Sequence, residues 1–163
     1  MATSRHIRVF DYVNQPYANV RDLLKSNPKT VFAKATKSAE ERAEDVAAQL
    51  RVELGAVRVA TDIAIRIHQV EETPATGRKG PVTRVQFEWE AAESPHLFPL
   101  MRADLAVYPL TATETQLEFS GNYKPPLKLF GTVVDALVGH RIAEAAVHRF
   151  VSEVNSYLKA ALA

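Results

Sequence analysis

The chain has 163 residues, of which 47% are hydrophobic and 24% charged, and its 20 basic and 19 acidic side chains leave a net charge of +1. This balance is typical of a soluble globular protein, and no block of like charge indicates a nucleic-acid partner. The absence of cysteine excludes thiol nucleophiles, disulfides, iron–sulfur clusters and thiolate zinc sites. No signal peptide or membrane-spanning run is visible, so we expect one cytoplasmic domain over residues 1–163 without stable membrane insertion.

The first third of the chain predicts one strand and then helices. Residues 6–13 are rich in β-branched and aromatic side chains, which favours a strand. Residues 14–27 predict a helix that Asn14 caps and in which Pro16 occupies the first turn. Residues 29–38 predict a turn or a short helix. Ser38, followed three residues later by a glutamate, then forms a capping box for a further helix.

From residue 50 onward the hydrophobic period changes to two, which predicts strands. Leu50, Val52 and Leu54 alternate within residues 50–54, and a longer strand follows over 57–70. Two glycines and two prolines place an exposed loop at 73–81. Three later segments alternate cleanly, namely residues 82–91, 101–107 and 116–123. The pattern predicts five or six antiparallel strands with one buried face and one wet face.

A helical pattern replaces the strand pattern after Pro125 and Pro126, because proline cannot donate to a strand ladder. The apolar residues between about 127 and 162 then recur at helical spacing, which predicts one long C-terminal helix. A curved sheet with one apolar face needs a cover, and this helix can supply it. The sequence therefore predicts an α+β fold in which a curved antiparallel sheet wraps around a long C-terminal helix.

The order of elements, and above all the segment "GNYKPPLKLFGTVVDALVGHRIAEAAVHRFVSEVNSYL", resembles the helix-grip fold of the START-like, or SRPBCC, superfamily. Gly131, Asp135 and Arg141 are the residues of the final helical segment that match it, whereas Lys128 departs from the small residue that many relatives have there. The resemblance implies a hydrophobic cavity between sheet and helix. Relatives, which include polyketide cyclase/dehydrase-like bacterial proteins, bind lipids, sterols, polyketides or plant hormones, and some catalyse cyclisation or dehydration.

The candidate ligand-binding residues lie on the predicted buried face of the sheet and on the predicted helix. A hydrophobic ligand cavity usually contains a few polar groups that orient its ligand. His140, Arg141 and Glu144 are the candidates for that role. They could equally cover the edge of the helix or pair with residues of the sheet. The complete set is Phe87, Trp89, Met101, Leu105, Leu117, Phe119, Tyr123, Leu137, His140, Arg141 and Glu144.

The segment "GHRIAEAAVH" places His140, Glu144 and His148 four residues apart on one helical face. Imidazole and carboxylate are metal ligands, but histidines eight residues apart are separated by about 12 Å along a helix axis. That separation is too large for one ion on a straight helix. The simpler interpretation is that Glu144 pairs with a histidine or with Arg141 on the helix surface. We therefore expect neither a metal site nor a cofactor.

Three functions remain open at this stage. The first is binding, or transport, of a small hydrophobic molecule such as a lipid or polyketide. The second is a cyclase, aromatase or dehydratase that uses a histidine or glutamate as general acid–base, although the sequence contains no diagnostic catalytic motif for such an enzyme. The third is a protein-interaction module, which would have a filled interior and a protein partner. We favour the first, because the resemblance implies a cavity and no catalytic residue stands out.

Overall fold

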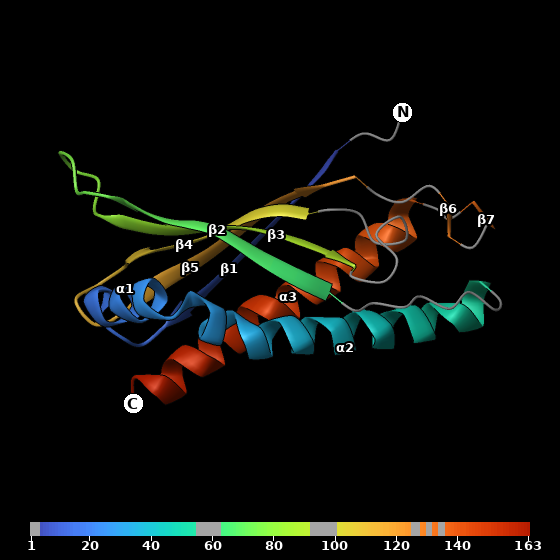
Figure 1. Cartoon of the computed structure of the whole chain (residues 1–163), viewed down its shortest axis with the longest axis horizontal. Coiled ribbons are helices and arrows are strands. Elements are labelled where there is room, and N and C mark those ends of the chain that lie inside the picture. Colours follow the sequence, from blue (N-terminus) through green and yellow to red (C-terminus); the bar gives the residue numbers. More distant parts are fainter. Residues whose placement is uncertain (1–3, 55–62, 92–100, 125–127, 130–131, 134–135) are drawn as a thin grey trace.

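The computed structural model describes residues 4–54, 63–91, 101–124, 128–129, 132–133 and 136–163. Figure 1 shows a twisted sheet with two long helices on one side of it. The elements, in chain order, are β1 (Arg5–Val13), α1 (Tyr17–Ser26), α2 (Pro28–Leu54), β2 (Ile63–Thr73), β3 (Val82–Ala91), β4 (Met101–Pro109), β5 (Thr115–Tyr123), β6 (Lys128–Leu129), β7 (Thr132–Val133) and α3 (Ala136–Ala161).

Five strands form one antiparallel sheet in the order β1-β5-β4-β3-β2. The alternation in the sequence explains which face is buried. In β3, Val85, Phe87 and Trp89 are buried, whereas Gln86 and Glu88 between them are partly exposed. The same alternation continues in β4 and β5. The predicted fold class, α+β with an antiparallel sheet and a long C-terminal helix, is confirmed.

The two long helices cover the buried face of the sheet from its two edges. α3 contacts β1 and β5, α2 contacts β2, and the helices pack against each other. Small residues on both helices, such as Ala35 of α2 and Ala146 of α3, let the backbones approach closely, and both are buried. Larger side chains, Phe32 and Phe150, then reach into the space under the sheet. No helix in the described part of the chain is both long and apolar enough to cross a bilayer.

The predicted strand at residues 50–54 is wrong, because α2 continues as one helix from Pro28 to Leu54. Ser38 accordingly lies inside that helix rather than at its beginning. No glycine or proline occurs between Pro28 and Gly55, and helix-forming residues dominate the segment, so nothing in the sequence interrupts the helix there. Three alternating apolar residues are too few to distinguish a strand from a buried helix face. The predicted break near residue 61 lies outside the described residues.

Two further details at the helix ends differ from the prediction. α1 has Pro16 rather than Asn14 at its N-cap, without a side-chain hydrogen bond to the cap. The C-terminal helix begins at Ala136 and not near residue 127, because the short strands β6 and β7 precede it. Thr132 and Val133 are β-branched, and such residues favour strand over helix. Gly131 and Asp135, on which the resemblance partly rests, lie outside the described residues.

Candidate functional site

The candidate site lies at one end of the sheet, where three neighbouring strands contribute one row of side chains. Trp89 of β3 pairs with Met101 of β4, and Met101 in turn pairs with Tyr123 of β5. All three side chains are buried, with 1%, 2% and 2% of their surface exposed. The period of two that predicted the buried face therefore also brings these predicted residues together. The remaining predicted sheet residues are buried on the same face; they are Phe87, Leu105, Leu117 and Phe119.

A cluster of aromatic rings fills the space next to this row. Phe150 of α3 lies at its centre, with ring centroids 5.3 Å from Phe32, 5.7 Å from Phe87, 5.6 Å from Trp89 and 6.0 Å from Phe119. Offset and edge-on contacts at such distances are favourable beyond the area that they bury. Sequence reasoning had missed Phe32, because it assigned residues 29–38 to a turn or short helix. The apolar pair Val31 and Phe32 was the available signal.

Tyr123 and His140 form the polar contact of the row. The Tyr123 hydroxyl lies 2.5 Å from His140 Nδ1, and the two rings are nearly parallel. His140 belongs to the second turn of α3, and 26% of its side chain is exposed. The pKa of Tyr123 is raised to about 12, mainly by burial; the charge of Arg5 opposes the rise, and that of Glu144 adds to it. The phenol keeps its proton well above physiological pH and can donate it in a hydrogen bond.

Glu144 extends this contact toward the surface of α3. One carboxylate oxygen lies 3.9 Å from His140 Nε2, and the other lies 4.0 Å from His148 Nε2. A carboxylate on that side favours the tautomer with hydrogen on Nε2, which leaves Nδ1 as the acceptor for the Tyr123 hydroxyl. Tyr123, His140 and Glu144 thus form a line of polar groups from the buried row to solvent.

The other helix residues of the predicted site are placed differently. Arg141 is exposed, and half of the Glu144 side chain is exposed, so neither lies in the buried row. The Leu137 side chain lies outside the described residues. His140 and His148 each approach Glu144 as separate surface pairs. Within the described part of the chain, no group of three or more histidine, aspartate or glutamate side chains is placed to hold a metal ion.

Gly121 allows the buried row to pack closely. A Cβ at this position would lie 2.8 Å from Phe119 Cε1 and 3.0 Å from Met101 Sδ. Both separations are shorter than ordinary carbon contacts, so any larger residue would force one of these side chains to move. Glycine at 121 therefore lets the Phe119 ring and the Met101 thioether lie across the β5 backbone next to Tyr123. Sequence reasoning had given this residue no role.

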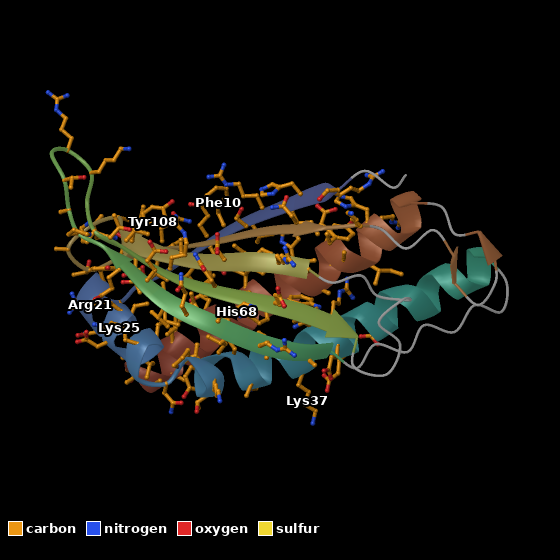
Figure 2. All side chains as sticks on the ribbon, turned by 45° about the horizontal axis from the view of Figure 1, so that its top comes forward. Phe10, Arg21, Lys25, Lys37, His68 and Tyr108 are labelled. Carbon is orange, nitrogen blue, oxygen red and sulfur yellow. The ribbon has the colours of Figure 1, made fainter. Side chains whose placement is uncertain are left out.

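The opposite face of the sheet is polar and open to solvent. Figure 2 turns the sheet toward the viewer, with Phe10, His68 and Tyr108 labelled along it. An open pocket of about 280 Å³ lies there, and its charged residues pair with one another: Glu88 lies 3.2 Å from Arg102 and 3.4 Å from His68. Exposed cross-strand pairs of this kind are typical of a solvated sheet face.

Comparisons with known proteins give structural neighbours only. No protein-family model matches the chain, and no curated protein sequence matches it. The Zhui aromatase/cyclase from Streptomyces sp. R1128 is 12% identical, with a TM-score of 0.49; the match covers 98% of this chain and 94% of that one. Truncated norcoclaurine synthase from Thalictrum flavum is 7% identical, with a TM-score of 0.44, and 96% of this chain and 94% of that one are covered.

A third neighbour, Ara h 8.0201, is 8% identical with a TM-score of 0.42, and the match covers 96% of this chain and 98% of that one. At such identities the similarity concerns the fold alone. In this chain the fold consists of the five-stranded antiparallel sheet and the long C-terminal helix described above. The described elements form a helix-grip arrangement, in which an antiparallel sheet packs against a long C-terminal helix.

Proposed function

We propose that the chain binds a small, mostly apolar molecule, such as a lipid or polyketide, where the row Trp89–Met101–Tyr123 meets the first turns of α3. The observation that carries the proposal is the Tyr123–His140 contact, a polar pair built into an otherwise apolar face. Small-molecule sites commonly have this composition, with hydrophobic and aromatic walls and a few fixed polar groups. His140 is partly exposed, so the pair lies at the boundary between the core and solvent.

Burial of the ligand supplies the affinity in this proposal, and the polar pair supplies its orientation. A molecule that loses about 300 Å² of apolar surface gains about 7 kcal/mol before the costs of association are subtracted. The Tyr123 hydroxyl is neutral at physiological pH, as tyrosines ordinarily are, and burial raises its pKa further, to about 12. It can therefore exchange its contact with His140 for one with a ligand oxygen without burying a charge.

Native mass spectrometry tests the proposal on protein that is purified from its own host without detergent. We expect an extra mass that extracts into organic solvent. Tyr123→Phe should carry less of it, because the variant lacks the orienting hydroxyl. Tyr108→Phe is the matched control: its hydroxyl lies 3.2 Å from Glu118 on the outer face, and its loss should leave the extra mass unchanged. Protein that is bare in its host and that binds no member of a lipid and polyketide panel would overturn the proposal.

A second candidate function is acid–base catalysis at the same position, as in a cyclase or dehydratase. The line Tyr123–His140–Glu144 favours it, because a neutral phenol, an imidazole and a carboxylate can pass a proton between a bound molecule and solvent. Under this proposal Tyr123 takes a proton from the bound molecule as it passes its own hydroxyl proton to His140 Nδ1, and Glu144 lies beside the imidazolium that forms. The imidazolium then returns the proton by the reverse route. No substrate is implied beyond the apolar class proposed above.

Turnover and binding must be measured separately to test catalysis. We expect His140→Gln to abolish turnover of a copurified or panel compound and to change its affinity by less than about threefold, since an amide can keep the contact with Tyr123. His148→Gln is the matched control on the same helix, and it should leave both quantities unchanged. If affinity and turnover fall together in His140→Gln, the residue contributes to binding and the catalytic role is overturned.

A further inference from the structure

One buried hydrogen-bond donor of the site has no acceptor among the described residues. Trp89 is 1% exposed, and its ring packs against Phe119 and Phe150 at centroid distances of 6.3 and 5.6 Å. Its indole Nε1–H finds no hydrogen-bond partner among the residues that the structure describes. Buried indole N–H groups are usually paired, and an unpaired one is costly. A phenylalanine would provide similar packing without that cost, so the N–H group calls for an explanation.

The neighbours of Trp89 in the row do not supply the acceptor. Met101, which pairs with Trp89 across the strands, has only a thioether, and sulfur is a weak acceptor. Tyr123 lies one strand further, about 10 Å away at the normal spacing of strands, and its hydroxyl already contacts His140. Among the described residues, the Tyr123 hydroxyl therefore has a hydrogen-bond partner in His140, whereas the Trp89 N–H group has none.

The chemistry of the open donor restricts what can occupy the site. An indole N–H group only donates, so the occupant must present an acceptor atom. The described neighbours of Trp89, namely Phe119, Phe150 and Met101, are uncharged and could not balance a buried carboxylate. An uncharged oxygen satisfies the donor without the large cost of burying an unpaired charge.

We infer that the ligand of the proposed site carries an uncharged carbonyl oxygen that accepts a hydrogen bond from Trp89 Nε1–H. The inference rests on the proposed binding function and narrows the ligand to apolar carbonyl compounds, as opposed to hydrocarbons or free fatty-acid anions. Trp89 then acts as the residue that selects for the carbonyl group, while the apolar rings around it accept the body of the molecule.

The sequence offers a direct test, because Trp89 is the only tryptophan and ¹⁵N-labelled protein has a single indole N–H resonance. The probes are 9-fluorenone and fluorene, which differ by a carbonyl in place of a methylene; benzophenone and diphenylmethane form a second pair of different shape. We expect each ketone to bind about five- to tenfold more tightly than its hydrocarbon, with a downfield shift of the indole proton. In Trp89→Phe the ketone and the hydrocarbon should bind equally.

The outcomes separate this inference from the proposed function. If ketones and hydrocarbons bind equally and the indole resonance does not move, the carbonyl inference is overturned and the binding site stands. A preference for ketones that persists in Trp89→Phe also overturns it, because the acceptor would then lie elsewhere. If no probe of either pair binds, the carbonyl inference is overturned, and the proposed function is decided by native mass spectrometry and the lipid and polyketide panel. Should Trp89→Phe not fold, the indole shift in the wild-type protein still decides the question.

Discussion

Two tyrosine hydroxyls, one near each end of the sheet, have different hydrogen-bond partners. At the beginning of β3, the Tyr17 hydroxyl of α1 lies 2.7 Å from Thr83 Oγ1, and Thr83 is fully buried. The second tyrosine, Tyr123, lies in the cross-strand row that includes Trp89, near the end of β3. Its hydroxyl contacts the partly exposed ring of His140. One partner is a neutral hydroxyl, and the other is a ring that can take up or release a proton.

The two tyrosine pairs differ in the roles that their hydrogen bonds can have. The Tyr17–Thr83 pair is neutral and local to the packing of α1 on the sheet, so its role is to hold that helix in place. The Tyr123–His140 pair lies next to Glu144 at the surface of α3. In the same row, the Trp89 N–H group has no hydrogen-bond partner among the described residues. Removal of the first hydroxyl should therefore affect stability, and removal of the second should mainly affect ligand binding.

The largest effect is expected at the aromatic centre that both ends share. Phe150→Ala removes a ring that contacts Phe32, Phe87, Trp89 and Phe119. We expect the free energy of unfolding to fall by about 3–5 kcal/mol, measured by urea denaturation. Leu110→Ala is the control; its side chain is exposed, and it should change stability by less than about 0.5 kcal/mol. A small effect of Phe150→Ala would mean that the rings repack without it.

A pair of glycines gives the next largest contrast between the two ends. Gly121→Ala should lower the free energy of unfolding by about 1–3 kcal/mol, because the new Cβ meets the Phe119 ring and the Met101 thioether. Gly80→Ala is the matched variant beside the other end of the sheet. Its Cβ would lie 3.6 Å from Pro109 Cγ, an ordinary contact, so we expect little change. Equal effects in thermal unfolding would show that the packing around Gly121 is not specially tight.

Removal of the two hydroxyls tests the comparison directly. Tyr17→Phe should cost about 1–2 kcal/mol, because it leaves the Thr83 hydroxyl buried without its partner. Tyr123→Phe should cost less than about 1 kcal/mol, since water can reach the partly exposed His140 ring. Urea denaturation of both variants under one condition provides the measurement. A larger loss in Tyr123→Phe would mean that its hydroxyl serves mainly to hold α3 in place.

The last prediction concerns a dependence of stability on pH at the alkaline end. The pKa of Tyr123 rises from its ordinary value of 10.0 to about 12 on folding, mainly because the group is buried. Between these values the folded protein keeps a proton that the unfolded chain releases. The contribution to stability is complete below pH 10 and is lost as the pH rises through about 12. Tyr123→Phe should therefore lose less stability than wild type across this interval; parallel curves would contradict the assigned cause.

Much of the fold follows from the sequence because, in a strand with one buried face, every second side chain is apolar. Phe87 and Trp89 could be assigned to the buried face in this way, and so could Phe119 and Tyr123. The same rule failed at residues 50–54, where three alternating residues continue a helix that nothing interrupts. A short alternation of apolar and polar residues fits a strand or one face of a helix, so the neighbouring residues decide which backbone hydrogen bonds form.

The site was harder to predict than the sheet. Sequence spacing grouped His140 with Glu144, but the contact between His140 and Tyr123 depends on how α3 docks against β5, which no local pattern encodes. The unpartnered N–H of Trp89 is likewise a property of the packed core, since a sequence shows the donor and not the acceptors around it. Phe32 entered the core through the same docking, from a helix whose length had been underestimated.

The irregular register of β2 has a consequence for how the protein behaves at high concentration. β2 is an edge strand, and its pairing with β3 shifts between Ile67 and Gln69, so His68 has no partner residue in β3. A straight edge would offer its free backbone groups to the edge of another molecule, whereas a bulge bends the strand and interrupts that template. A charged or polar residue there, as His68 is, adds solvation. We therefore expect this one extra residue to disfavour pairing between the β2 edges of two copies.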